Sequence, residues 1–502
     1  MNSRLAKIVL CLCALCAASA NYVSFAKDKS DTQTSDATRF TQLLNDGSAD
    51  DAEKQIAKYL QSHGDDSAVR ALHAEALYKL GRYHYAVDEL KEAMKTRIDN
   101  PDDALLMGKI YQTMHRSKDA VQWYKKFISL NPRDSRVPQY ETLQRVLQDA
   151  AKSNLEKHRK VQSQVGNYLA AVTRNAMMRW SSPDKIRVFI KDGSDVSGYR
   201  PEFEESLRQA FDEWSESTSG TVAFIMVPSP DSTDMTVTWS SDLHSPALKA
   251  EAGLANTSYG AHGLERADIL LLTVDPFKEG PIGKNMLYNV CLHEIGHALG
   301  LEGHSPTEGD IMYPALGVQQ GLSDRDINTV LALYSADLKS DKALSDKDEY
   351  GRPLPPSVMC ERLTNAGSIA AMNGDFNGAI EKLQSALEIN PKQDLAGKNI
   401  AVAANNLAIV PGTAPDEAMR LLHLALYWEP TNDAARTNLN SLLQSLGKDP
   451  KAFGARIECA EQCRAHNDIK GAIVEYTEAL SLKSDTATKV KLDALKNAST
   501  HK

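Results

Sequence analysis

Two stretches of the chain, residues 37–165 and 357–490, place small residues and prolines at a common period of about 34 residues. In the second stretch Gly367, Gly374 and Ala379 hold this spacing in one unbroken copy. Helices that cross closely need small side chains at the contact, and a proline ends the second helix of a pair. The period therefore predicts two all-α domains, each built from stacked pairs of helices.

These spacings resemble the tetratricopeptide repeat, whose stacked helix pairs form concave surfaces that bind peptides or proteins. Leu106 to Pro132 shows the same register in the first stretch, with Gly108 and Tyr124 inside it. The resemblance implies a protein partner on the repeats. It leaves open whether that partner is a substrate or a regulator.

Residues 176–335, between the two repeat domains, lose the period. Lys185–Ile190 reads as a strand, Pro201–Ser217 as an amphipathic helix, and three later segments as further strands. This order predicts a mixed α/β domain with one twisted sheet. The three later strands are expected at Val222–Val227, Met235–Trp239 and Ile269–Val274.

Residues 336–356 are first charged and then rich in proline, which is typical of a linker. This pattern predicts that the repeats after it separate from the middle domain. A chain that ends near residue 345 would then keep the fold and the chemistry of residues 176–335.

The N-terminus has the pattern of a cleaved signal peptide. Arg4 and Lys7 precede a short apolar run, and small residues follow at Ala18 and Ala20, with a second possible cleavage point after Ala26. Residues 1–26 thus predict export, to an extracellular, periplasmic or cell-surface location, with no stable membrane span after processing. The polar residues 27–36 are expected to be disordered.

The formal net charge of −9 argues against nucleic acid as a partner, because nucleic-acid binding needs a concentrated positive field. Four cysteines remain after the predicted processing, which is too few for a disulfide framework in a chain of this length. They are Cys291, Cys360, Cys459 and Cys463.

The segment from His293 to His304 carries the chemistry. His293 and His297 are four residues apart, so on a helix both imidazoles project from one face and can bind the same zinc ion. Glu294 is rotated about 100° from His293 around the helix, where it can reach a zinc-bound water instead. His304 can be the third ligand only if the helix stops, and Gly300 can adopt the left-handed conformation that ends it.

This motif resembles the metzincins, and its surroundings are similar to the matrixin branch. Met312, in Asp310–Pro314, matches the methionine turn, and Leu322–Tyr334 matches the closing helix. The resemblance implies an α+β metzincin-type catalytic domain with one catalytic zinc, cutting within protein or peptide substrates. It also implies a substrate extended along a sheet edge near Gly253–Tyr259, and it leaves calcium binding open.

The chain departs from animal matrixins in two ways. No cysteine stands before the middle domain in the processed chain, so a cysteine switch from the N-terminal side is not available. Only His244 and His262 lie where a second, structural zinc would be held, and we expect both in surface loops, since a tetrahedral site needs four ligands.

Two functions compete on these residues. In the first, the chain is an exported zinc endopeptidase in which Glu294 acts as general base on the zinc-activated water. In the second, the repeats make a binding scaffold and the peptidase domain is retired. A retired domain is expected to lose the base or a ligand, and this chain keeps Glu294 and all three histidines.

Overall fold

The computed structural model describes residues 33–64, 66–173, 178–243, 252–260, 263–278, 280–315, 321–335, 346–348 and 350–500. The predicted signal peptide, His244 and His262 lie outside these ranges, as does most of the predicted linker. The chain divides into two compact units, Met1–Lys157 and His158–Lys502.

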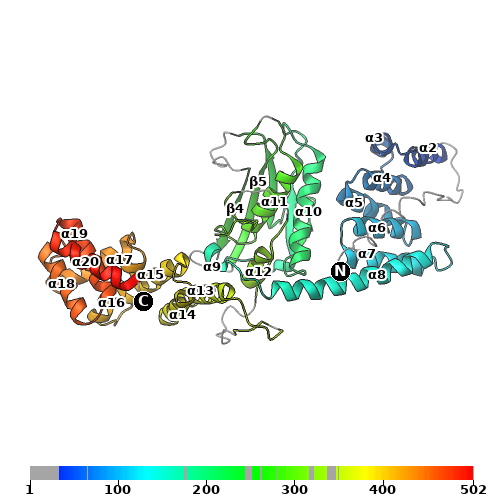
Figure 1. The fold of residues 1–502 in the computed structure, drawn as a ribbon. Coiled ribbons are helices and arrows are strands. Elements are labelled where there is room, and N and C mark those ends of the chain that lie inside the picture. The colour runs from blue at the N-terminus through cyan, green and yellow to red at the C-terminus, as the bar shows by residue number, and fades with distance from the viewer. Residues whose placement is uncertain are drawn as a thin grey trace. The chain divides into compact units, whose positions relative to one another are not determined.

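The first unit is made of helices that pack in successive pairs, as the repeat period predicts (Figure 1). The close crossing is visible at Gly108, where an added Cβ would lie 2.5 Å from the Tyr124 ring. The prediction of disorder over residues 27–36 is wrong for residues 33–36, which form the start of helix α2. The helices are α2 (Gln33–Asn45), α3 (Ala49–Ser62), α4 (Ser67–Lys79), α5 (Tyr83–Met94), α6 (Pro101–Thr113), α7 (Ser117–Leu130) and α8 (Val137–Gln162), which continues into the second unit.

In the second unit, the middle domain contains a five-stranded sheet in the order β2-β1-β3-β5-β4. The first four strands of that order run parallel, and β4 pairs antiparallel with β5 at the edge. The predicted strands are present, and β4 is an additional one at the edge that the matrixin resemblance implied. The strands are β1 (Ile186–Ile190), β2 (Phe224–Met226), β3 (Met235–Ser240), β4 (Gly253–Gly260) and β5 (Gly263–Leu272).

Two helices, α10 (Pro201–Ser217) and α11 (Lys284–Ala298), pack against each other beside this sheet (Figure 1). The predicted apolar face of α10 is fully buried, and its Trp214 indole N–H donates to the Leu292 carbonyl of α11 at 3.0 Å. This contact fixes α11 in the core. The short elements are α9 (Leu169–Val172), the 3₁₀ turn η1 (Pro183–Lys185) and α12 (Asp324–Leu333).

The core of this region begins before the predicted boundary at residue 176. Tyr168, Leu169 and Val172 are buried in it together with the sheet and α11. Gly303 permits their close approach, since an added Cβ there would lie 2.5 Å from the Ala171 carbonyl oxygen. The segment around α9 therefore belongs to the middle domain and not to the repeats before it.

The C-terminal repeats continue through eight helices to residue 500. Gly367 allows a close helix crossing in the same way as Gly108, because an added Cβ at Gly367 would lie 2.5 Å from Leu383 Cγ. The helices are α13 (Pro356–Met372), α14 (Phe376–Ile389), α15 (Asp394–Ala408), α16 (Pro415–Trp428), α17 (Asp433–Ser445), α18 (Phe453–Ala465), α19 (Ile469–Leu482) and α20 (Thr486–Thr500).

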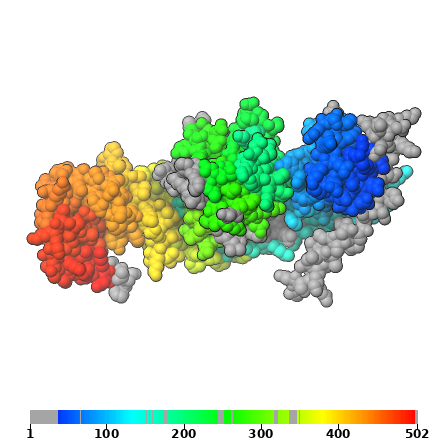
Figure 2. Space-filling view, turned by 90° about the horizontal axis from the view of Figure 1, so that it is seen from above, coloured from blue at the N-terminus to red at the C-terminus, as the bar shows by residue number. Residues whose placement is uncertain are grey.

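Helix α13 packs directly against the middle domain. Asn365 accepts a hydrogen bond from the buried Ala170 N–H at 2.9 Å and donates to the Asn167 side chain at 2.6 Å, and Ile369 packs on the core of the middle domain. Figure 2 shows the surface of these first C-terminal helices, in yellow, next to the green surface of the middle domain. These contacts oppose the expectation that the repeats separate freely at the linker.

Candidate metal centre

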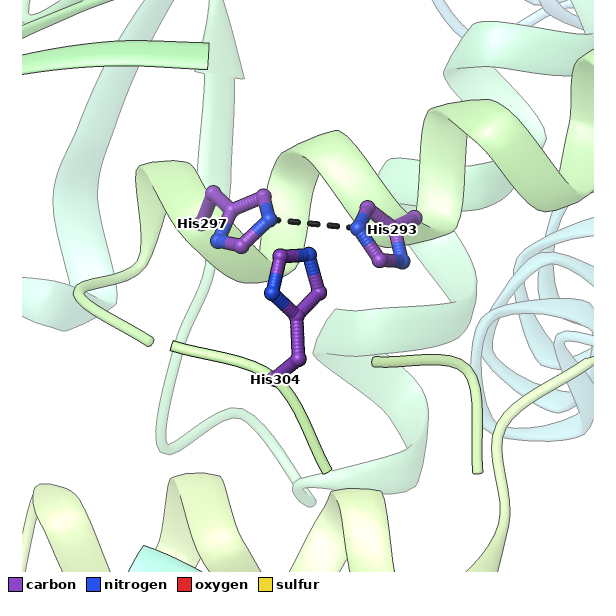
Figure 3. Close-up of side chains that lie close together, drawn as sticks. All are labelled: His293, His297 and His304. Atoms are coloured by element: carbon purple, nitrogen blue, oxygen red, sulfur yellow. Dashed lines mark hydrogen bonds between the residues drawn. The ribbon is translucent and has the colours of Figure 1, made fainter. Parts of the chain in front are cut away.

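Helix α11 presents His293 and His297 on successive turns, as the spacing predicts, and His304 returns from the loop that follows (Figure 3). The imidazole centroids lie 4.8 Å (His293–His297), 5.1 Å (His297–His304) and 5.3 Å (His293–His304) apart. One ligand nitrogen from each ring lies within 4.8 Å of the others. His293 is buried and His304 is exposed, so the cluster is reachable from solvent on the His304 side.

Backbone carbonyls determine which nitrogen of the two helical imidazoles carries a proton. His293 Nδ1 donates to the Ile311 carbonyl at 2.7 Å, and His297 Nδ1 donates to the Leu301 carbonyl at 2.6 Å. Because a carbonyl only accepts, the two Nε2 atoms face each other with lone pairs at 3.1 Å. Burial lowers the pKa of His293 to about 4, so a shared proton is disfavoured at neutral pH. A shared cation fits this donor set.

The glycine break occurs where the sequence predicts it. Helix α11 ends at Ala298, and Gly300 has φ of +103°, a conformation that favours glycine. An added Cβ at Gly300 would also lie 1.9 Å from the Met178 carbonyl oxygen. The reversal that brings His304 back to the helix thus depends on a residue without a side chain.

We expect Gly300→Ala to lower the unfolding temperature and the zinc content of the protein. The left-handed backbone costs a residue with a Cβ about 1–2 kcal/mol, and the clash with the Met178 carbonyl adds to this. Gly220→Ala is the matched control, because Gly220 has φ of +83° with nothing within 4 Å of an added Cβ. Equal destabilisation of the two variants, with zinc content unchanged, would contradict the proposed role of Gly300.

Met312, which the resemblance places in a methionine turn, packs against helix α11. Its side chain is fully buried, and an added Cβ at Gly296 would lie 2.3 Å from its sulfur. Gly296 stands between the two helical histidines in the sequence. Met312 therefore packs against the helix backbone at the level of the cluster, and its own carbonyl accepts from the Ser305 N–H at 2.8 Å.

Glu294 is buried and lies at the start of the edge strand. An added Cβ at Gly253, the first residue of β4, would lie 2.7 Å from Glu294 Cγ and 2.9 Å from Oε1. The carboxylate is therefore placed between helix α11 and the strand edge that the resemblance assigns to substrate. Glycine at position 253 is what allows this approach.

A buried polar network beneath the cluster was not found from the sequence. Asp310 accepts from Ser305 Oγ at 2.5 Å, from Ser323 Oγ at 2.8 Å and from Arg325 Nε at 3.0 Å. Asp326 accepts from the Ile311 N–H at 2.9 Å and from the Tyr168 hydroxyl. These bonds hold the turn at 310–312, whose Ile311 carbonyl in turn orients His293.

The network continues into the C-terminal repeats. Arg325 Nη1 donates to Glu361 Oε1 of α13 at 2.5 Å, while its Nε is bound to Asp310. The side chains of Arg325 and Glu361 are 18% and 23% exposed, so this ion pair is largely shielded from water. The first repeat helix is thus connected through two ion pairs to the turn that supports the metal cluster.

Two sequence-profile matches agree with this geometry. Residues 179–335 match the family described as Matrixin, and residues 104–134 match the tetratricopeptide repeat. The matrixin match begins at the strand region and ends after α12, so it contains the three histidines, Glu294 and Met312.

Two curated proteins are similar to the same part of the chain. Karilysin from Tannerella forsythia is 29% identical over 154 residues, which is 26% of this chain and 29% of that protein. Stromelysin-2 from Rattus norvegicus is 30% identical over 102 residues, which is 19% of this chain and 21% of that protein. The chain thus spans less than a third of the length of these relatives.

Among solved structures, the TPR domain of P58(IPK) aligns with 93% of this chain and 98% of its own at 12% identity, with a TM-score of 0.23. The yeast Tom70 structure aligns with 93% of this chain and 96% of its own at 13% identity, also with a TM-score of 0.23. Scores this low add nothing to the description of the fold. The profile matches identify residues 179–335 as a matrixin-type peptidase domain in a chain that also carries tetratricopeptide repeats.

Proposed function

We propose that this chain is an exported zinc-dependent endopeptidase whose repeats recruit protein substrates or partners. The observation that supports it most is the convergence of His293, His297 and His304, with the two helical Nε2 lone pairs facing each other at 3.1 Å. Two neutral imidazoles in this tautomer can each bind zinc through Nε2, and His304 supplies the third ligand.

Each residue of the cluster has a distinct role in this proposal. The three histidines hold the metal, and Glu294 accepts a proton from the attacking water and returns one to the leaving amine. Zinc, when bound, supplies a Lewis acid for the peptide carbonyl and lowers the pKa of water. Met312 and the network around Asp310 keep the histidines in position.

The substrate would bind along β4. This strand is one of the two edge strands of the described sheet, and an edge strand offers backbone groups to which an extended peptide can add as a further strand. Gly253, at the start of β4, lies against Glu294, and this contact supports a role for Glu294 as a base that acts on a peptide bound along β4.

The scaffold alternative rests on the repeats, which are built to bind protein. This alternative requires that the three histidines and Glu294 no longer catalyse a reaction. The described cluster keeps every proposed ligand, and Glu294 is buried beside the β4 edge, so the arrangement favours an active peptidase.

Among the described residues, no helix is both long enough and apolar enough to cross a membrane.

Zinc removal tests the proposal. We expect a strong chelator to abolish cleavage of an internally quenched peptide, and stoichiometric zinc to restore it, because the metal is required for the reaction. The His297→Ala variant should show neither activity nor restoration. Hydrolysis that persists in zinc-free protein would argue against the proposed function.

A further inference from the structure

A second group of potential metal ligands lies in the C-terminal repeats, away from the catalytic cluster. His423 of α16, Cys463 of α18 and Asp468 at the start of α19 place one ligand atom each within 4.8 Å of one another. His423 is 1% exposed, and the other two side chains are partly buried. Three different helices or helix ends therefore converge on one point inside the repeats.

The distances between these groups are compatible with a shared metal ion. His423 Nδ1 lies 3.7 Å from Cys463 Sγ and 3.6 Å from Asp468 Oδ2. Ligand bonds of about 2.0–2.3 Å at tetrahedral angles separate ligand atoms by roughly these distances. Asp468 caps α19 through Oδ1, which accepts from the Gly471 N–H at 2.9 Å, so its Oδ2 is the oxygen that faces the cluster.

The far side of the imidazole is held as metal-binding histidines are usually held. His423 Nε2 lies 2.9 Å from Glu475 Oε1, and a carboxylate on the second nitrogen fixes the ring and its tautomer. Glu475 is itself fully buried and accepts from Arg456 Nη1 at 3.0 Å. This arrangement directs Nδ1, not Nε2, at the cysteine and the aspartate.

The space beside the ligands is kept open by a glycine. An added Cβ at Gly471 would lie 2.3 Å from Asp468 Oδ2 and 2.6 Å from His423 Nδ1. Any other residue would fill the position that the two ligand atoms face. From this convergence we propose that His423, Cys463 and Asp468 bind a second zinc ion, which joins α16 to the α18–α19 pair.

Zinc is the metal that suits this donor set. A thiolate selects zinc over magnesium and calcium, and nitrogen, sulfur and carboxylate oxygen are its usual ligands. Three protein ligands leave a fourth position for water, and Cys463 is only partly buried.

The competing interpretation is an ion network without metal. Burial alone lowers the pKa of His423, but its contacts with Asp468, Cys463 and Glu475 raise it overall.

Cobalt binding to the full-length chain separates the two interpretations. The catalytic cluster is first disabled by His293→Ala and His297→Ala, so that only the second site remains. We expect this protein to bind one equivalent of Co²⁺ and to show the near-ultraviolet absorption of a thiolate–cobalt bond. Zinc should displace the cobalt and raise the unfolding temperature.

Matched variants locate the ligands. Cys463→Ser should abolish the absorption and weaken zinc binding by more than about 10-fold, because loss of even an outer-shell partner of a ligand typically weakens binding by about that much. Cys459→Ser, one turn earlier on the same helix, should change neither, since Cys459 Sγ contacts Lys448 Nζ at 3.6 Å and is not in the cluster. Asp468→Asn keeps a good helix cap but should also weaken binding, which separates lost ligation from misfolding.

Either of two results would overturn the proposal. One is a catalytic-site variant that is folded and binds no cobalt. The other is cobalt binding that Cys463→Ser and Asp468→Asn leave unchanged. Both results concern the repeats alone, so they are independent of whether the catalytic cluster cleaves peptides.

Discussion

Glu294→Gln is expected to lower kcat for peptide hydrolysis at least about 100-fold, the usual contribution of a general base, while the protein keeps its catalytic zinc. The physical reason is that glutamine has nearly the same shape but cannot accept the water proton. The ligand histidines are positioned by the Ile311 and Leu301 carbonyls, which the substitution does not touch. Zinc content by elemental analysis and initial rates on a quenched peptide measure the two effects.

The control is Glu308→Gln, an exposed glutamate on the loop that follows His304. It should retain full activity. If Glu294→Gln instead loses zinc together with activity, Glu294 is a ligand or supports one, and its assignment as the base is wrong. If Glu294→Gln stays active, a different group takes the proton.

Ending the chain near residue 345 is expected to destabilise the catalytic domain by about 2–4 kcal/mol and to lower its peptidase activity. The estimate combines about 1 kcal/mol for each lost buried hydrogen bond with the apolar surface exposed under α13. Ala170 N–H would lose its Asn365 partner, and Arg325 would lose Glu361. Urea unfolding of the zinc-loaded protein and kcat/KM on a short peptide measure the outcome.

A chain ending near residue 449 provides the comparison, because it removes α18 to α20 but keeps α13 and its contacts. We expect it to cleave short peptides at the rate of the full chain. Arg325→Ala in the full chain should reproduce part of the truncation effect, whereas Arg420→Ala, on an exposed pair with Glu417, should change stability by less than about 0.5 kcal/mol. Full activity and stability of the chain ending near 345 would show that the repeats are separable after all.

Much of the architecture follows from local patterns. The small residues at Gly108 and Gly367 predict helix crossings because only a missing side chain allows the approach seen there. Helix α10 occupies the predicted range 201–217 because its apolar spacing matches one helical face. The positions of His293, His297 and His304 follow from the helical period and from Gly300, so the candidate centre could be placed from the motif alone.

What the sequence did not predict depends on contacts between distant segments. Strand β4 has the sequence Gly-Leu-Ala-Asn-Thr-Ser-Tyr-Gly, which lacks the alternation of apolar residues that marks a strand. The second half of β4 is mostly exposed. Arg325 and Glu361 look like ordinary surface charges until α13 folds against α12 and α9. The structure shows a capping box of Ser323 and Asp326 at the start of α12, and the sequence gives no sign that the Ile311 N–H donates a hydrogen bond to Asp326.

Cleavage of a mixed peptide library, followed by mass spectrometry of the new termini, tests the central claim most directly. The protein lacking residues 1–26 would be compared with its Glu294→Gln variant at equal zinc content. We expect new termini inside peptides with the unaltered protein, their loss on chelation and return with zinc, and almost none with Glu294→Gln. A folded, zinc-loaded protein that cuts no peptide, or a Glu294→Gln variant that cuts equally well, would contradict it.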